Sequence, residues 1–410
     1  MSKDNRDFFK TKNSWSEIKD RLLGCYLVPY FQKVLHTGRP ILYIDCFAGK
    51  GKFDDGKNGS PRIALKVRDE CINNSHKPNA RIDACFIDLN YADELRSNIV
   101  DYVNTDNVRV ISGKYEDLIL GLLSTEHNNN VFLYIDPYGI KALDYHLFEQ
   151  FADAKFNSIE ILINMNSFGF IRAGCCALDV DFTHDEALNS LDDLKEYEPT
   201  PFDDSSTSIK LLNKIAGGEY WQDIIKAKQT GIIDGYLAEK RFSAEYKTRL
   251  QQKFKYVLDM PIRMKPGQRP KYRMIHVSNH AVGCILMADN MLERASELFV
   301  EIQNPSQLSL FQQNVHREII DERSIRKDME EFLCSLHCEM SADELVASFF
   351  TQYGVVCKSR TIREIWKSME QAGEIKVVRK PATTPSGRPS TFFSEDRKNK
   401  QSLTIRWHKP

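Results

Sequence analysis

The sequence lacks long apolar runs and lacks an excess of charge of one sign. No window approaches the roughly 18 consecutive apolar residues of a membrane-spanning helix, and the opening residues, MSKDNRDFFKTK, contain no signal-peptide core. The 56 Lys and Arg residues balance 57 Asp and Glu, for a formal charge of -1, so no overall field attracts nucleic acid or a lipid surface. These absences predict a cytoplasmic protein without a membrane segment, and they confine any basic surface to a local patch.

Cysteine is scarce and scattered, with 10 residues in a chain of 410 and no paired spacing. Reduced thiols are therefore expected. Cys334, His337 and Cys338 share one face of a predicted helix, but a structural zinc site takes four protein ligands and no second pair follows. We predict no metal site. The sequence also contains neither a Ser/His/Asp arrangement nor a Gly-x-x-x-x-Gly-Lys-Ser/Thr motif, so hydrolase and P-loop functions have no support.

Five short, almost continuously apolar segments alternate with helix-length stretches. Strands with this pattern are covered by helices on both faces, which is typical of a parallel sheet. Two later segments, 255–264 and 271–279, flank a Pro/Gly turn and predict an antiparallel hairpin. The prediction is a Rossmann-like α/β fold with a mostly parallel seven-stranded sheet and an antiparallel last strand. The five apolar segments are 41–45, 84–88, 108–112, 131–136 and 159–165.

The pattern changes in the last quarter of the chain. Helices are expected over 322–338, from Ser341 onward and over 361–371, followed by strands at 374–379 and 390–393. Three helices and a two-stranded wing predict a winged helix-turn-helix. The expected domains are therefore an α/β domain over 1–300, with a helical insertion or cap at 170–250, and a winged-helix domain over 301–410.

A glycine-containing turn follows the first predicted strand, in the sequence ILYIDCFAGKGKF. Glycines at such a turn allow the backbone to approach a ligand closely. The third glycine of the dinucleotide-binding pattern is replaced by Asp54, which disfavours a nicotinamide-dependent oxidoreductase. The form Asp-x-Phe-x-Gly-x-Gly instead resembles motif I of class I S-adenosylmethionine-dependent methyltransferases. The cofactor-binding residues expected here are Asp45, Phe47, Ala48, Gly49 and Gly51.

Acidic residues follow the second and third predicted strands. Asp88 ends the second strand, where a carboxylate can accept hydrogen bonds from both ribose hydroxyls of an adenosine cofactor, or can cap the following helix. Glu116 and Asp117 follow the third strand, where an acid in this fold class commonly meets the adenine amino group; a solvated loop pair is the alternative. These three residues complete the expected cofactor site.

The sharpest motif is YIDPYGI at residues 134–140, after the fourth predicted strand. It resembles the D/N-P-P-Y/F motif of amino-methyltransferases, in which a carboxylate or amide and a proline carbonyl accept hydrogen bonds from an amine while an aromatic ring stacks on the base. The catalytic candidates are thus Asp136, Pro137 and Tyr138, with Asn164 and Asn166 expected beside the substrate. An Asx-Pro turn is the structural alternative.

The order of these motifs, DCFAGKG, GSPRIAL, DPYG and HAVGCILMADNM, resembles the three-Cys-motif partner (TcmP) family of bacterial proteins from about Lys10 to Met291. The resemblance implies a methyltransferase-like chain that uses S-adenosylmethionine. It also implies a partner encoded nearby, a protein with a radical-SAM-like three-cysteine motif. The cysteines of this chain form no such motif, and the resemblance supplies no substrate.

Local positive charge marks the predicted winged helix. Residues 376–410 hold nine Lys or Arg against two acids. Phosphate contact is one interpretation, and a solvated basic tail or a protein-docking module is the other. The nucleic-acid-binding candidates are Lys358, Arg360, Arg363, Lys367, Lys380 and Arg388.

Together the patterns predict a methyltransferase that transfers a methyl group from S-adenosylmethionine to a nitrogen of RNA or DNA, working with the three-cysteine-motif protein. In-line displacement needs orientation of the acceptor more than a strong base, so a single acidic acceptor, Asp136, suffices. The alternative is a non-catalytic adaptor that keeps the fold and docks its partner or nucleic acid through the winged helix.

Overall fold

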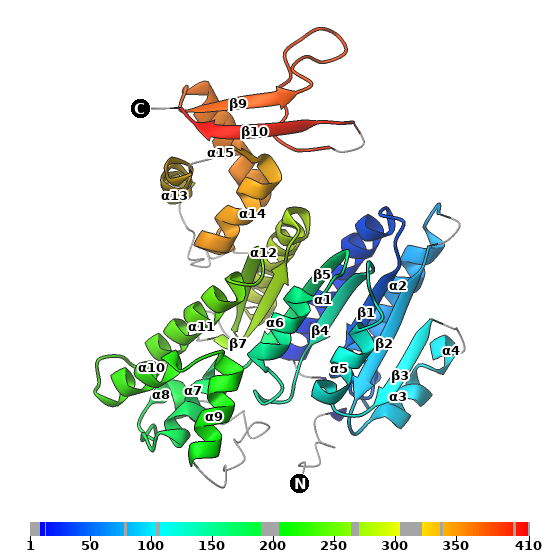
Figure 1. Ribbon diagram of the computed structural model, residues 1–410, viewed down its shortest axis with the longest axis vertical. Coiled ribbons are helices and arrows are strands. Elements are labelled where there is room, and N and C mark those ends of the chain that lie inside the picture. Colours follow the sequence, from blue (N-terminus) through cyan, green and yellow to red (C-terminus); the bar gives the residue numbers. More distant parts are fainter. Residues whose placement is uncertain are drawn as a thin grey trace. The chain divides into compact units, whose positions relative to one another are not determined.

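The computed structural model forms two compact units, Met1–Asn279 and His280–Pro410, shown in Figure 1. The expected domain boundary at residue 300 falls inside helix α12 (Ala281–Gln303), which belongs as a whole to the second unit. No helix within the described part of the chain is long and apolar enough to cross a membrane. The described residues are 9–12, 14–77, 80–103, 107–189, 205–263, 270–303, 322–336, 339–396 and 399–408.

The first unit is built on a seven-stranded sheet in the order β3-β2-β1-β4-β5-β7-β6. The strands β1 to β5 run parallel, whereas β7 is antiparallel to both of its neighbours. This confirms the predicted α/β, Rossmann-like fold with an antiparallel last strand, and the strand order is that of class I methyltransferases. The strands are β1 (Ile41–Asp45), β2 (Ile82–Asp88), β3 (Val108–Ser112), β4 (Asn130–Ile135), β5 (Ser158–Met165), β6 (Tyr256–Arg263) and β7 (Pro270–Ser278).

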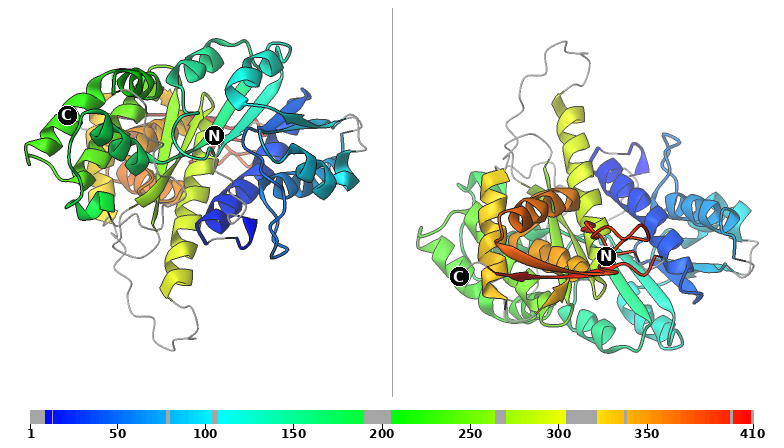
Figure 2. Two further views of the ribbon diagram at one scale, coloured as in Figure 1. Left: turned by 90° about the horizontal axis from the view of Figure 1, so that it is seen from below. Right: turned by 90° about the horizontal axis from the view of Figure 1, so that it is seen from above.

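Helices cover both faces of this sheet (Figure 2), which explains why its strands are apolar at successive positions. On one face, the rings of Tyr43 and Phe132 pack against aromatic side chains of α1 (Ser14–Leu35). On the other face, Leu42 and Ile44 join one buried cluster with α5 (Tyr115–Leu123) and α6 (Tyr145–Asp153).

The remaining helices of the first unit connect the strands. Between β5 and β6 the described residues form a mainly helical region that contributes to the same apolar cluster. The connecting helices are α2 (Ser60–Asn73), α3 (Ala92–Asn98), α4 (Val100–Val103), α7 (Ser167–Ala177), α8 (Glu186–Asn189), α9 (Ser205–Ala216), α10 (Tyr220–Gln229) and α11 (Gly235–Gln251).

The second unit contains a small three-stranded antiparallel sheet in the order β8-β10-β9. The segment 390–393, expected to be a strand, is not one: β9 pairs instead with a later segment, Ser402–Trp407, whose apolar residues Leu403 and Ile405 are buried. Besides α12, its elements are α13 (Glu322–Ser335), β8 (Met340–Ser341), α14 (Ala342–Tyr353), α15 (Ser359–Gln371), β9 (Ile375–Lys380) and β10 (Ser402–Trp407).

Candidate functional site

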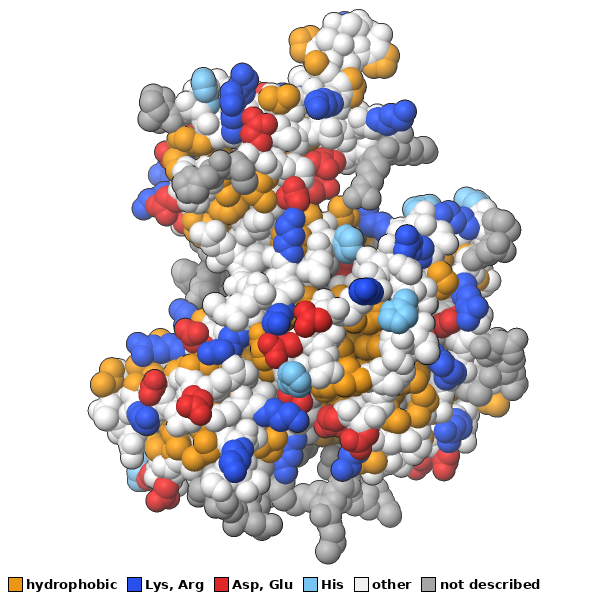
Figure 3. Space-filling model, viewed as in Figure 1, with side chains coloured by type: hydrophobic (Ala, Val, Ile, Leu, Met, Phe, Trp, Pro, Cys, Tyr) orange, Lys and Arg blue, Asp and Glu red, His pale blue; other side chains and the backbone are white. Residues whose placement is uncertain are grey.

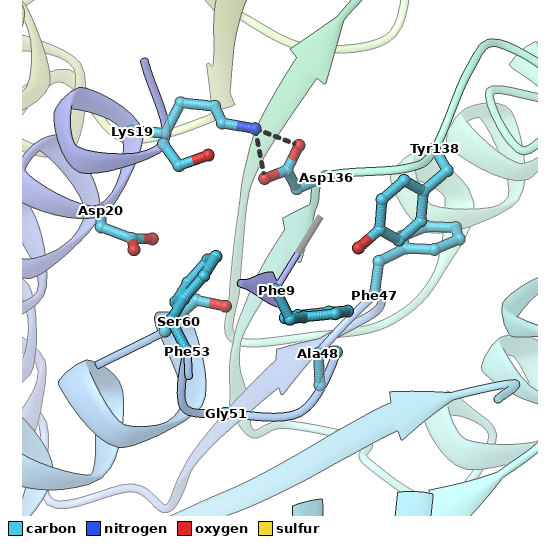
Figure 4. A pocket seen from close by; sticks show the side chains of 13 residues that line it. Phe9, Lys19, Asp20, Phe47, Ala48, Gly51, Phe53, Ser60, Asp136 and Tyr138 are labelled. Carbon is cyan, nitrogen blue, oxygen red and sulfur yellow. Dashed lines mark hydrogen bonds and ion pairs between the residues drawn. The ribbon is translucent and has the colours of Figure 1, made fainter. Parts of the chain in front are cut away.

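A hollow lies beside the carboxyl ends of β1 and β4, where open α/β sheets bind their ligands. Its lining comes from five places in the chain: the N-terminal segment, helix α1, the glycine turn after β1, the start of α2, and the turn after β4. Figure 4 shows Lys19 and Asp136 on one side of this hollow and several aromatic rings around it. The predicted residues Phe47, Ala48, Gly49, Gly51, Asp136 and Tyr138 all line it.

The glycine turn has the backbone conformation that its sequence predicts. Gly49 and Gly51 have φ values of 59° and 73°, a region that L-residues with side chains rarely adopt. A Cβ atom on Gly51 would lie 2.6 Å from Cδ1 of Leu95, and the Gly51 carbonyl accepts a hydrogen bond of 2.9 Å from the Gly59 amide. The turn is therefore closely packed on the side that contacts Leu95 and Gly59.

Asp88 fixes this turn to the end of β2. One carboxylate oxygen accepts a hydrogen bond of 2.8 Å from the Gly49 amide, and the other accepts bonds of 2.8 and 2.7 Å from the amides of Asn90 and Tyr91. A carboxylate offers about four acceptor positions, so three of them are used within the chain. Asp88 thus shapes the turn, and it is not among the residues that line the hollow.

Asp45 is fully buried at the end of β1. Its carboxyl group accepts a hydrogen bond of 2.6 Å from the Ser60 hydroxyl and one of 3.3 Å from the Phe47 amide. Burial raises the pKa of Asp45 to about 8, and the Ser60 hydrogen bond only partly opposes that rise. The group is therefore largely neutral below this pH.

Asp45 should make the stability of the protein depend on pH. Its pKa is about 8 in the folded chain and 3.8 as a free group, so the folded state favours the protonated form. The stabilising contribution of protonated Asp45 is therefore lost as pH rises from about 4 to about 8. We expect the free energy of unfolding of wild type, relative to Asp45→Asn, to fall by a few kcal/mol, on the order of one per pH unit. Urea unfolding of both proteins across this pH range measures the difference in their free energies of unfolding. A difference that does not change with pH would contradict the prediction.

Asp136 is held by three donors, which sequence reasoning did not identify. The Lys19 ammonium, from α1, donates to both carboxylate oxygens at 2.8 and 2.7 Å. The Asn164 amide, at the end of β5, donates to Oδ1 at 2.7 Å, and the Tyr134 hydroxyl donates to Oδ2 at 3.3 Å. Asn164, expected beside the substrate, contacts Asp136 but is not among the residues that line the hollow, whereas Asn166 caps α7 by accepting from the Gly169 amide.

Aromatic side chains line much of the hollow. Tyr138 is 38% exposed, while Pro137 is buried. Phe53 follows the glycine turn, and Phe9 reaches the site from the N-terminal segment. The Phe9 ring packs against the Phe53 ring with centroids 5.6 Å apart, and its carbonyl accepts a hydrogen bond of 2.8 Å from the Asp54 amide. The segment at residues 9–12 therefore covers the glycine turn.

Contacts near the N-terminus were not marked by any motif in the sequence. Lys12 pairs with Asp20 at 2.5 Å and donates to the Asn58 carbonyl at 2.6 Å. Phe9 carried no signal in the sequence, because the pair Phe8 and Phe9 before a helix matches no ligand-binding motif. Lys19 was hidden in the same way within an amphipathic helix.

Glu116 and Asp117 lie in the first turn of α5. Both side chains are exposed, and neither is among the residues that line the hollow. Acidic residues at this end of a helix interact favourably with its dipole, so their position has a structural explanation independent of any ligand.

The predicted basic residues of the second unit fall into two groups. Lys358, Arg360 and Arg363 face carboxylates of Glu293, Glu364 and Asp343 at 3.6, 2.9 and 3.8 Å. Lys367, Lys380 and Arg388 are exposed, and the described residues offer them no ion pair. On the face that Figure 3 shows, basic and acidic side chains are interspersed.

No group of metal-ligating side chains is found among the described residues. Of the cluster considered from the sequence, Cys334 is exposed on α13, while His337 and Cys338 lie outside the described residues.

No family model and no curated protein matches the sequence. Among solved structures, the chain is similar to a cyclopropane-fatty-acyl-phospholipid synthase-like protein from Lactobacillus casei ATCC 334. The identity is 12%, the match covers 64% of this chain and 92% of that chain, and the TM-score is 0.25. At these values the likeness carries no functional conclusion, and the fold class stands on the strand order and the glycine turn.

Proposed function

We propose that the protein is an S-adenosylmethionine-dependent methyltransferase that acts on a nitrogen of RNA or DNA. The observation that carries the proposal is the position of Asp136, followed by Pro137 and Tyr138, in the same hollow as the glycine turn. A carboxylate there can orient an amine while the neighbouring ring stacks on a base.

The residues around the hollow suit an adenosine cofactor. The glycine turn has no side chains that keep a ligand from its backbone, and Phe47 and Phe53 supply apolar and π surface. The Phe9 ring, which covers Gly49, would have to move aside for a ligand to approach that residue. Asp88 retains about one acceptor position for a ribose hydroxyl, and Glu116 and Asp117 would meet the adenine only at the edge of the site. When bound, S-adenosylmethionine supplies an electrophilic methyl group. The Asp136 carboxylate would accept a hydrogen bond from the substrate amine and so orient the nitrogen that receives the methyl group.

The second unit supports a nucleic-acid substrate. Its order of helix, strand, two helices, strand, loop and strand is consistent with the winged helix expected from the sequence. A domain of that kind commonly places its last helix against nucleic acid. The exposed residues Lys367, Lys380 and Arg388 lie on that helix and on the wing. We assign the three-cysteine-motif protein as the partner on the sequence resemblance alone.

One observation favours a second function, that of a non-catalytic adaptor. The acceptor positions of Asp136 are occupied by Lys19, Asn164 and Tyr134, so an incoming amine must displace a donor. If no displacement takes place, the fold would serve only to bind the partner or nucleic acid.

Methyl transfer from labelled S-adenosylmethionine to tRNA, rRNA and DNA tests the two functions. The enzyme proposal expects label in at least one nucleic acid, at a base nitrogen located by mass spectrometry. The adaptor proposal expects no label, with or without the partner, but retained binding of nucleic acid or partner.

Lys367, Lys380 and Arg388 should contribute to nucleic-acid affinity mainly through phosphate contacts. Replacing all three with Gln is expected to weaken binding of duplex DNA or RNA about tenfold or more at low salt and to reduce the slope of log affinity against log salt by up to about three. Fluorescence anisotropy at several salt concentrations measures both. The control replaces Lys327, an exposed lysine of α13 near Glu331, with Gln; an equal loss in the control would contradict the assignment.

A further inference from the structure

The carboxylate of Asp136 has no free acceptor position. Four hydrogen bonds reach its two oxygens: two from the Lys19 ammonium at 2.8 and 2.7 Å, one from Asn164 at 2.7 Å and one from Tyr134 at 3.3 Å. A carboxylate offers about four such positions. An amine substrate can therefore be accepted only after one donor leaves.

Lys19 is the donor best able to leave. Asn164 and Tyr134 lie in or at the end of buried strands, whereas Lys19 is attached through a flexible four-carbon chain and itself lines the hollow. It is the one basic side chain among the described residues of that lining. Its ammonium also lies 5.5 Å from the centroid of the Tyr272 ring, a contact that supports a cation at this wall.

A departing Lys19 needs a new anion, because its side chain is only 7% exposed and an unpaired buried ammonium is costly. The neighbouring carboxylate of Asp20 already pairs with Lys12 at 2.5 Å. Burial raises the pKa of Asp20 to about 6, while the charges of Lys12 and Lys19 both act to lower it. Asp20 therefore already interacts with both cations and gives a departing Lys19 no new anion. An anion that a ligand brings into the hollow is a better partner for the Lys19 ammonium than Asp20 is.

We propose that Lys19 binds the carboxylate of the cofactor's methionine moiety and, by moving there, releases Asp136 to accept the substrate amine. The proposal rests on the proposed function and adds an order of events to it: cofactor binding precedes productive substrate binding. No bond is formed or broken in this exchange. One ion pair, Lys19 with Asp136, is replaced by another, Lys19 with the ligand carboxylate.

Two ligands that differ in the carboxylate test this exchange. S-Adenosylhomocysteine carries the amino-acid group, whereas 5′-methylthioadenosine keeps the nucleoside and the thioether but lacks it. We expect wild type to bind S-adenosylhomocysteine more tightly than 5′-methylthioadenosine. Lys19→Met should lower the affinity for S-adenosylhomocysteine by roughly ten- to a hundredfold and change the affinity for 5′-methylthioadenosine by no more than about twofold. Calorimetric titration measures both affinities.

Three variants make the result specific. Lys19→Arg keeps the cation and should retain most of the preference. Lys33→Met removes an exposed lysine from the same helix and should change neither affinity. Asp136→Asn removes the competing charge, so it should hold or tighten S-adenosylhomocysteine binding, and thermal unfolding of each variant confirms that it is folded.

Each alternative outcome has a distinct meaning. If Lys19→Met weakens both ligands equally, or neither, Lys19 does not bind the carboxylate and the exchange is wrong while the cofactor site stands. If Asp136→Asn weakens S-adenosylhomocysteine, the two anions do not compete for Lys19 and the exchange is also wrong. If folded wild type binds neither ligand, the proposed function itself fails, and the exchange fails with it.

Discussion

Replacing Asp136 with Asn should lower the rate of methyl transfer at least about a hundredfold, the range found when one oriented polar group is removed from an active site. An amide serves at this position in the D/N motif, but here donors reach both oxygens of Asp136, so the NH2 group of an Asn would face a donor. Asn also lacks the charge that stabilises the positive nitrogen formed on transfer. Steady-state transfer of labelled methyl, at saturating cofactor, measures the loss.

The Asp136 variant needs a control for general effects on charge. Asp153 is exposed at the end of α6, away from the lining of the hollow, so Asp153→Asn should retain wild-type activity. Full activity in Asp136→Asn would show that the acceptor has been assigned to the wrong residue. A parallel loss in both variants would mean that net charge, rather than the site, controls transfer.

Replacing Gly51 with Ala should weaken S-adenosylhomocysteine binding by more than about tenfold. The φ value of 73° costs a residue with a side chain about 1 to 3 kcal/mol. The new Cβ would also lie 2.6 Å from Cδ1 of Leu95, which is fully buried and cannot move aside freely. The turn should therefore be displaced and should fit the cofactor less well. Calorimetric titration measures the resulting loss of affinity.

Gly56 provides a matched control for Gly51. Its φ value is 87°, so Ala suffers comparable backbone strain, but nothing lies within 4 Å of the Cβ that it would gain. Gly56→Ala should therefore lose some stability and keep its cofactor affinity. Equal losses of affinity in the two variants would show that backbone strain, and not the packing of the turn, limits binding.

Most of the sheet and the glycine turn could be predicted because their signals are local. A strand covered on both faces must be apolar along its length, and ILYID and VFLYID are. Two glycines with positive φ likewise follow from one short motif. The second strand of the wing was misplaced because STFF has strand-like composition, whereas the pairing that forms depends on burial of Leu403 and Ile405.

The contacts within the site could not be predicted, because they join residues far apart in the sequence. Lys19 and Asp136 are separated by 117 positions, and nothing in an amphipathic helix marks which lysine will turn inward. Asp88 shows a related limit: its position at the end of β2 was predictable, but its three bonds to backbone amides depend on how two turns meet.

The measurement that tests the central claim most directly is calorimetric titration of the whole protein with S-adenosylhomocysteine, with NAD as the control ligand. We predict a dissociation constant in the micromolar range, which corresponds to a binding free energy of about 8 kcal/mol, and no binding of NAD. Binding of S-adenosylhomocysteine should be lost in Asp88→Ala, because the glycine turn loses its anchor to β2. Absence of S-adenosylhomocysteine binding by the folded protein would contradict the methyltransferase assignment and favour the adaptor.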